Sequence, residues 1–483
     1  MSSGVGTKTS GMREISRAVR AAPLPAALIG VLLFASLVGL RAYTAVSGRP
    51  LLIDFHAFFC GAGVALRGAN PYLQEPIARC EVPFLAQYLP HGSVGIAMPA
   101  PLPGYVFAPI APLTMLPFGA AAALWLLLLS AALALTIVIL QQLSGLAWPI
   151  VALAVVSGDA ASALALGQLA PLAVLGLAAS ALALRRDRPR RAACCAAATL
   201  VLPQVALPVL LVLFVHERRA RATLVAILLA AAAISVAMLG WHANVEYVTL
   251  VLPAHALSER NFIRQVALAP MLYQLGVPTR LAYLAGGAVA LGALVTAIAV
   301  TPAVVRAYRD RAFVVLVPSV FALIGGTFLH VDALAAALPC ALVLNARGEG
   351  ARPLAKVGFV LAAIPWVPSG ITVYLAPLLV LTVFVMAYNT WRLPFALSAG
   401  LAGLALCVMF LEDVSFINAL SPALQPVVTH FSPNALAEVS WRAFMAATGS
   451  NGASAGMWLG RWLCVLGPVA LAGALVKVPR GNR

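Results

Sequence analysis

Runs of about 20 apolar residues, the length a helix needs to cross a bilayer, recur along almost the whole of this chain. Hydrophobic residues make up 62% of its 483 residues and charged residues only 10%, a balance that excludes an ordinary soluble domain. Lipid offers backbone groups no partner, so such runs form helices that satisfy their own backbone. The sequence therefore predicts an all-α, polytopic transmembrane helical bundle of about 12 membrane segments, with surface helices in its exterior loops.

Basic residues, which give a net charge of +16, gather beside these runs. Short loops rich in Arg and Lys stay in the cytoplasm, which favours this interpretation over a nucleic-acid surface. We expect a multi-pass protein of the cell inner (plasma) membrane. Its expected parts are a cytoplasmic N-terminal segment (1–23), one transmembrane domain (24–476) and a cytoplasmic tail (477–483).

Three more polar stretches, at about 47–101, 242–269 and 412–456, are expected to be exterior loops. Apolar periodicity within the first of them predicts surface helices at 55–66 and 82–89. Cys60 and Cys80 also fall in this loop. A disulfide between them is an option in an oxidising compartment, and the sequence alone leaves it open.

One apolar stretch, 192–215, has arginines at both ends and is interrupted by Pro203 and Pro208. Proline breaks a helix, and irregular backbone survives in a membrane only when protein covers it. The pattern predicts a re-entrant hairpin of two half-helices, with Arg188 and Arg219 on the same side of the membrane.

Only 15 residues are acidic, and three of them, Asp54, Asp159 and Asp332, are flanked by long apolar sequence. A carboxylate at the mouth of a membrane helix is costly and therefore a candidate functional group, although a helix N-cap is the alternative. The glutamates of the exterior loops, Glu259 among them, are expected to be mostly solvated.

Several short motifs follow one another in a recognisable order. They are Asp54-Phe55, Gly68-Ala69-Asn70-Pro71-Tyr72, Gly167-Gln168 and His330-Val331-Asp332, with proline-rich segments at 98–103 and 108–113. Over about residues 20–345 the chain resembles glycosyltransferase family 87, the polyprenol-phosphate-mannose-dependent α-mannosyltransferases of the GT-C superfamily. It differs at Phe58 and Phe59, where the family often has a tyrosine, and at Leu202-Pro203, where it often has Lys-Pro.

The resemblance implies a GT-C type fold and a catalytic aspartate, Asp54, facing the exterior or periplasm. A sugar, mannose in the family, would pass from a polyprenyl-phosphate donor to a glycolipid or cell-envelope glycan acceptor by inverting single displacement. The phosphate leaves without a strong acid, so one carboxylate suffices as general base. The expected partners are the donor, the acceptor and membrane lipids, with no nucleic acid.

The departing phosphate needs fixed positive charge, for which Arg260, Arg264 and His330 are the exterior candidates. The two arginines are equally suited to anchoring lipid head groups. Further candidates for substrate binding are Gln168, Asn70 and Tyr72, although the last two are also suited simply to building the Asn-Pro turn. Asp332 and Asp159 are secondary carboxylates.

The sequence contains no paired metal-ligand motif and no phosphate-binding glycine loop, so no metal or other cofactor is expected. A lipid or solute transporter (a flippase) is the main alternative function, and a non-catalytic scaffold is another. Transporters often contain internal repeats and charges near the bilayer midplane, neither of which is evident here.

Overall fold

The computed structural model describes eight stretches of the chain, and the other residues are left undescribed. Some expected features lie outside these stretches: the first span (24–46), the spans near 371–388 and 394–410, and Asp159. The described residues are 52–85, 95–157, 163–164, 166–262, 264–347, 352–363, 432–447 and 455–477.

The described part of the chain is helical and contains no named strand, which confirms the all-α membrane bundle. Four helical stretches are long and apolar enough to cross a membrane: Phe118–Ser144, Arg218–Ser258, Thr279–Tyr308 and Trp458–Val476. Large apolar side chains on their outer faces, such as Leu229 and Leu291, are exposed, as expected for surfaces that meet lipid. The count of about 12 membrane segments stays a prediction.

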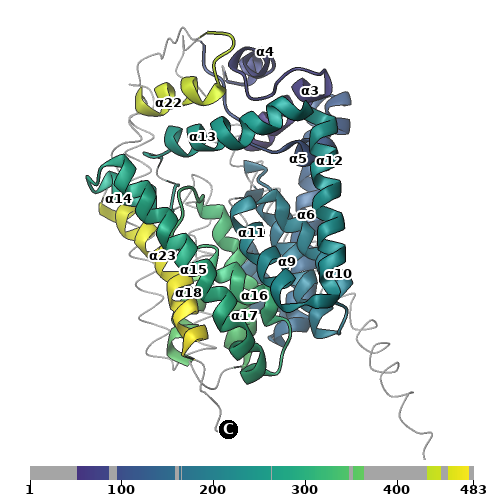
Figure 1. Cartoon of the computed structure of the whole chain (residues 1–483), viewed down its shortest axis with the longest axis vertical. Coiled ribbons are helices and arrows are strands. Elements are labelled where there is room, and N and C mark those ends of the chain that lie inside the picture. Colours follow the sequence, from purple (N-terminus) through teal and green to yellow (C-terminus); the bar gives the residue numbers. More distant parts are fainter. Residues whose placement is uncertain are drawn as a thin grey trace, which may run out of the picture. The chain divides into compact units, whose positions relative to one another are not determined.

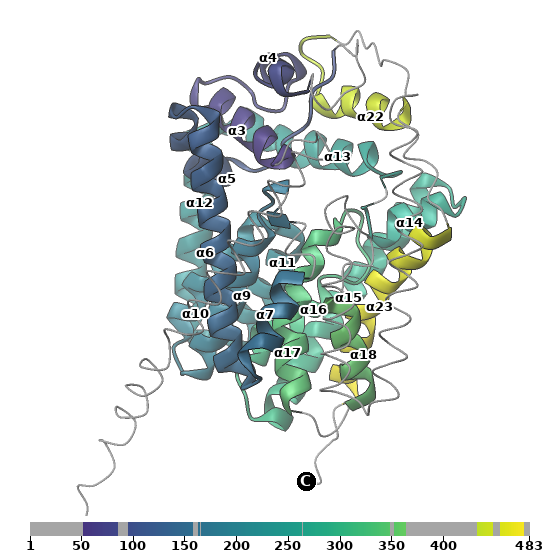
Figure 2. The same ribbon diagram turned by 180° about the vertical axis from the view of Figure 1, so that it is seen from behind.

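The bundle has two flanks and a buried centre (Figures 1 and 2). On one flank stand α6 (Phe118–Ser144), α9 (Ala170–Arg185) and α12 (Arg221–Glu246). On the other stand α15 (Thr279–Tyr308), α18 (Arg352–Ala363) and α23 (Ala455–Val476). Between them lie α16 (Phe313–Phe321), in which every residue is buried, and α17 (Leu338–Arg347). Three short helices complete the bundle: α7 (Trp148–Ser157), α14 (Leu268–Gln274) and η5 (Val331–Ala337).

One end of the bundle is covered by short helices that lie across it (Figure 1). They are α3 (Ile53–Leu66), α4 (Gln74–Leu85), α13 (Leu252–Ser258) and α22 (Ala437–Ala447), with α5 (Gly104–Ile110) and η1 (Ala111–Met115) beneath α3. α12 is kinked at Gly240, whose φ of 75° is a conformation that glycine adopts without strain. From the end of α12 the π-helical stretch η4 (Tyr247–Val251) leads into α13. Of the two expected surface helices, 55–66 corresponds to α3. The prediction of 82–89 is wrong in position, because α4 begins earlier, at Gln74.

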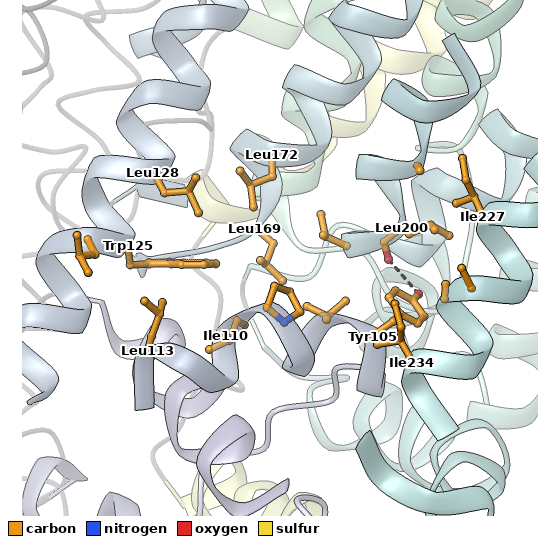
Figure 3. A pocket seen from close by; sticks show the side chains of 17 residues that line it. Tyr105, Ile110, Leu113, Trp125, Leu128, Leu169, Leu172, Leu200, Ile227 and Ile234 are labelled. Atoms are coloured by element: carbon orange, nitrogen blue, oxygen red, sulfur yellow. Dashed lines mark hydrogen bonds between the residues drawn. The ribbon is translucent and has the colours of Figure 1, made fainter. Parts of the chain in front are cut away.

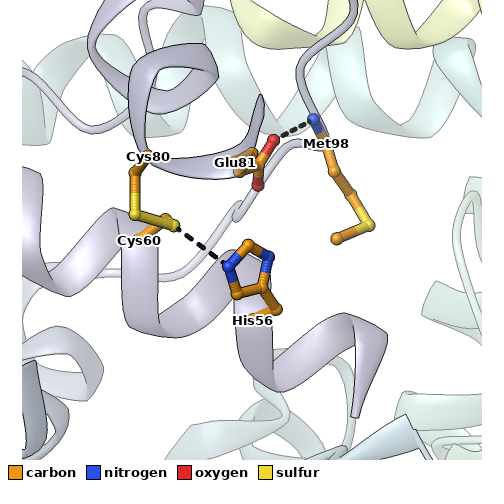
Figure 4. The surroundings of a disulfide bond; sticks show 5 residues. All are labelled: His56, Cys60, Cys80, Glu81 and Met98. Atoms are coloured by element: carbon orange, nitrogen blue, oxygen red, sulfur yellow. Dashed lines mark hydrogen bonds between the residues drawn. A yellow bond between two sulfur atoms is a disulfide. The ribbon is translucent and has the colours of Figure 1, made fainter. Parts of the chain in front are cut away.

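Two connections hold α4 in place within this layer. The disulfide that the sequence left open is present and joins Cys60 of α3 to Cys80 of α4 (Figure 4). The backbone on either side of Tyr72 and Gln74 pairs with the segment before α22, where the Ala437 N–H donates to the Tyr72 carbonyl at 3.0 Å. The disulfide spans 20 residues, whereas the backbone hydrogen bonds join parts of the chain that lie more than 350 residues apart in the sequence.

At the opposite end, the proline-interrupted stretch folds as two short helices, α10 (Pro189–Ala196) and α11 (Pro203–His216), joined by η2 (Ala197–Val201). The chain then continues through η3 (Arg218–Ala220) into α12. Both ends of the stretch lie together, since Arg219 is 3.9 Å from Asp187. Arg311 bonds to both Asp187 and Glu217, and Arg185 pairs with Asp310 at 2.6 Å. Glu217 and Asp310 are thus buried ion partners.

This geometry makes a topology prediction. Cysteines that replace Arg188 and Arg219 are expected to react with a membrane-impermeant thiol reagent from the same side. A cysteine that replaces Arg79, whose side chain is 80% exposed on α4 at the other end, should react from the opposite side. Labelling of Arg188→Cys and Arg219→Cys from different sides would contradict the hairpin.

Candidate active site

Asp54 lies in the first turn of α3, where the N-cap residue is Leu52, so the N-cap interpretation of Asp54 is wrong. Its Oδ2 accepts a hydrogen bond of 2.6 Å from Nε2 of Gln168. Gln168 stands immediately before α9, so this bond joins two motifs that are 114 residues apart in the sequence.

The turn at Gly167 is what allows α3 to come so close. Gly167 has a φ of 76°, and a Cβ added there would lie 2.6 Å from Cβ of Phe55. The Trp125 indole of α6 stacks on Phe55 at 4.9 Å and donates a hydrogen bond of 2.9 Å to the Gly167 carbonyl. Backbone conformation, close packing and a buried hydrogen bond together fix Gln168 against Asp54.

A second group of candidates is arranged by a short antiparallel contact between Gln265 and His330. The Val331 N–H donates to the Arg264 carbonyl at 3.0 Å, which places Arg264 and His330 on adjoining segments. Asp332, at the start of η5, is 2% exposed, and its Oδ1 lies 4.0 Å from Nδ1 of His330.

These two groups form one electrostatic neighbourhood around Asp54. Burial raises the pKa of Asp54 to about 6 and outweighs the opposing charges of Arg264 and His330. The nearby Asp332 raises this pKa further, and the Gln168 hydrogen bond lowers it. The fold thus gathers five of the residues predicted for the site: Asp54, Gln168, Arg264, His330 and Asp332.

Glu259 is a member of this neighbourhood that the sequence did not single out. It is only 5% exposed, and its Oε2 accepts a hydrogen bond of 2.6 Å from Nε2 of His330. The expectation that the exterior-loop glutamates are solvated is wrong for Glu259 and also for Glu81 and Glu438. Glu259 lies two residues after the apolar run 247–257, but this position does not indicate which segments bury it.

The other candidates have different surroundings. The Asn70 side chain donates to Glu246 at 2.8 Å and accepts from the Tyr72 backbone N–H, which is the turn-building role. The Tyr72 hydroxyl donates to the Leu102 carbonyl at 2.8 Å. The Arg260 guanidinium lies over the Tyr273 ring, 4.6 Å from its centroid. These contacts join the three side chains to partners other than Asp54.

One cluster has the residue types of a metal site. Within the part of the chain that the structure describes, His56, Cys60 and Cys80 bring their ligand atoms within 4.8 Å of one another. The two sulfurs are bonded to each other, so only the imidazole remains free to act as a ligand (Figure 4). The neighbouring Glu81 accepts a hydrogen bond from the Met98 N–H at 2.7 Å, which anchors α4 to the segment before α5.

An apolar cavity of about 480 Å³ is lined in part by Leu169, the residue that follows Gln168 in the sequence (Figure 3). Trp125 and Leu169 form part of its wall, one bonded to Gly167 and the other following Gln168. Leu124 and Leu128 of α6 and Ile234 of α12 also line it and are exposed, so the cavity opens between two helices long enough to span the membrane.

Residues 103–328 match the sequence model of glycosyltransferase family 87. This match supports the family that the motifs indicate. It also supports a membrane glycosyltransferase. No curated protein and no solved structure matches the chain. The matched region includes Gln168, Glu259 and Arg264, whereas the His330-Val331-Asp332 motif begins two residues after it and Asp54 lies 49 residues before it.

The partly buried carboxyl of Asp54 makes a stability prediction. Because folding raises the pKa of Asp54 from 3.8 to about 6, the stability that the protonated group provides is complete below pH 3.8 and is lost as the pH rises through about 6. Asp54→Asn is neutral throughout, so it should gain stability over the wild type across this window, by at most about 3 kcal/mol. Thermal unfolding midpoints of both proteins at several pH values test this. A constant difference between them from pH 3.8 to about 7 would contradict it.

Proposed function

We propose that this glycosyltransferase moves a sugar from a polyprenyl-phosphate donor to a glycolipid or cell-envelope glycan acceptor. Asp54 is the general base, the face that carries it is the periplasmic or exterior face of the inner membrane, and mannose is the sugar that the family resemblance favours. The observation that carries the proposal is the Asp54–Gln168 pair, held beside two basic side chains and an apolar cavity that opens between membrane helices.

The proposed reaction is a single displacement. The acceptor oxygen forms a bond to the anomeric carbon and gives its proton to the Asp54 carboxylate. The bond between the anomeric carbon and the phosphate oxygen breaks, and its electron pair leaves with the polyprenyl phosphate. A base whose pKa is about 6 is ionised at neutral pH and still accepts a proton effectively.

The charges around Asp54 suit this chemistry. Arg264 and His330 act on the Asp54 carboxyl, so a phosphate bound near it would meet the same two cationic groups. Gln168 holds Asp54 in one orientation, and Asp332 adjoins His330. Asp332 is the second choice for the base, and Asp159 remains a secondary candidate. In this proposal Arg260, Asn70 and Tyr72 shape the surrounding loops, with Arg260 suited to a lipid head group.

The apolar cavity is suited to the donor's isoprenoid chain. Its wall is formed almost wholly by apolar side chains, and it extends from Leu169 to exposed side chains of α6 and α12. A chain that enters from lipid between these helices would bring its phosphate toward Asp54 without leaving an apolar surrounding.

The central test is Asp54→Asn. This variant keeps the shape of the side chain and a partner for Gln168, but it cannot take a proton. Turnover should fall by at least about 10²-fold, while binding of a polyprenyl-phosphate sugar persists. Asp332→Asn, assayed in the same detergent preparation, is the comparison. Near-native turnover by a folded Asp54→Asn protein would show that another residue is the base and would contradict this mechanism.

A second test concerns the cavity. Ala231 of α12 lines it, whereas its neighbour Ala232 is exposed and does not. Ala231→Trp should weaken binding of long-chain donors by about tenfold or more and spare short-chain analogues, because the indole fills the space for the chain. Ala232→Trp is the matched control. Equal binding of long-chain donors by both variants would place the chain elsewhere.

A further inference from the structure

Glu259 is a carboxylate that the proposed chemistry does not use, although it touches a residue of the site. It follows α13 directly and is 5% exposed. A buried carboxylate is stable only when its oxygens have partners, so the identity of those partners indicates what the residue does.

Three side chains from different segments donate to Glu259. His330 Nε2 and Gln265 Nε2 donate to its Oε2, at 2.6 and 3.0 Å. Trp441 of α22 donates its indole N–H to Oε1 at 3.1 Å. Gln265 is itself fixed, because its Oε1 accepts from the Leu329 N–H at 3.0 Å and its carbonyl accepts from the buried Arg461. These hydrogen bonds fix the position of the Glu259 carboxylate, which in turn fixes the orientation of the His330 ring through its Nε2.

The other ring nitrogen of His330 faces the site. Its Nδ1 lies 4.0 Å from Asp332, and His330 acts on the carboxyl of Asp54. An imidazole that is hydrogen-bonded to one carboxylate and lies 4.0 Å from a second is stabilised as the cation by both negative charges.

We propose that Glu259 is a positioning residue of the transferase site, which holds the His330 ring in place as a cation facing Asp54 and Asp332. Its part in the reaction rests on the proposed function, whereas its effect on His330 does not. Through Trp441 the same carboxylate joins α22 to the site.

The surrounding charges agree with this assignment. Burial alone would lower the pKa of His330, but the charge and hydrogen bond of Glu259, together with Asp332, raise it above 6.5. Burial would likewise raise the pKa of Glu259, yet the neighbouring histidines and the hydrogen bonds lower it to about 2. The titratable and charged groups that face His330 are Glu259, Asp332, Arg264, His255 and Asp54.

The directions of these two pKa shifts determine how the stability of the protein depends on pH. The stability that charged His330 provides is present below pH 6.5 and is lost as the pH rises through its raised pKa. The contribution of Glu259 is present above pH 4.5 and is lost as the pH falls through about 2. Both groups are therefore charged between pH 4.5 and pH 6.5.

The first experiment observes His330 directly. Nitrogen NMR of full-length protein labelled with ¹⁵N-histidine, in lipid nanodiscs, reports the charge of each imidazole, and His330→Gln identifies the His330 signal. We expect a His330 titration midpoint above pH 6.5 in the wild type. In Glu259→Gln, which keeps an acceptor oxygen but loses the charge, the His330 titration midpoint should fall by about one pH unit or more.

The control is Glu75→Gln, which removes a carboxylate from an exposed ion pair with Arg79 on α4 and should leave the midpoint unchanged. A His330 midpoint below pH 6.5 in the wild type overturns the proposal without any variant, which covers the case in which Glu259→Gln fails to fold. An unchanged midpoint in a folded Glu259→Gln protein overturns it as well.

The second experiment concerns turnover. The alkaline limb of the pH profile should move to lower pH in Glu259→Gln, and Glu259→Gln should add no further loss in a His330→Gln background. Additive losses would mean that Glu259 acts independently of His330, contrary to the proposal. Failure of the Asp54→Asn test would remove the proposed reaction but leave the NMR result standing, so the two failures are distinguishable.

Discussion

The close approach of α3 to the turn at Gly167 is the contact on which the candidate site depends. Phe55, packed between Gly167 and the Trp125 ring, sets the height of α3 over the bundle. Asp54, one residue earlier, then meets Gln168, one residue later than the glycine. A larger residue at 167 would force α3 outward and separate the two polar side chains, so the geometry of the site is fixed mainly by apolar packing next to it.

Burial affects the carboxylates of this end of the bundle in opposite ways, according to their partners. Asp54 has one amide donor and more distant charges, so desolvation prevails and its pKa rises. Glu259 accepts hydrogen bonds from three side chains, one of which is His330, so its ionised form prevails. One acid is therefore suited to exchanging a proton and the other to a permanent charge, a division typical of sites in which two carboxyl groups have different roles.

Much of this site was predictable from the sequence, because its parts are short motifs next to apolar runs. The polar residues Asp54, Gln168, His330 and Asp332 each interrupt or border long hydrophobic sequence. A polar residue there is energetically costly and is therefore a candidate functional residue. Asn70 and Tyr72 belong to an equally recognisable motif, yet an Asn-Pro turn has the same residues whether or not it contacts a substrate.

Glu259 was not predictable, because its burial depends on segments that are far away in the sequence. Trp441 lies 182 residues further on, and no local pattern indicates that α22 covers this loop. The number of membrane crossings was also beyond reach, because several apolar helices are shorter than a full span and one long apolar helix bends at Gly240.

The bend at Gly240 has a consequence for how this stretch can evolve. After the bend the chain remains helical as far as Ser258. The direction in which Glu259 points therefore depends on the number of residues between it and Gly240. Each residue added to or removed from a helix rotates the downstream residues by about 100° and shifts them by about 1.5 Å. Homologues should therefore vary freely in the side chains exposed along 241–252 and yet keep the number of residues between the glycine and the glutamate constant.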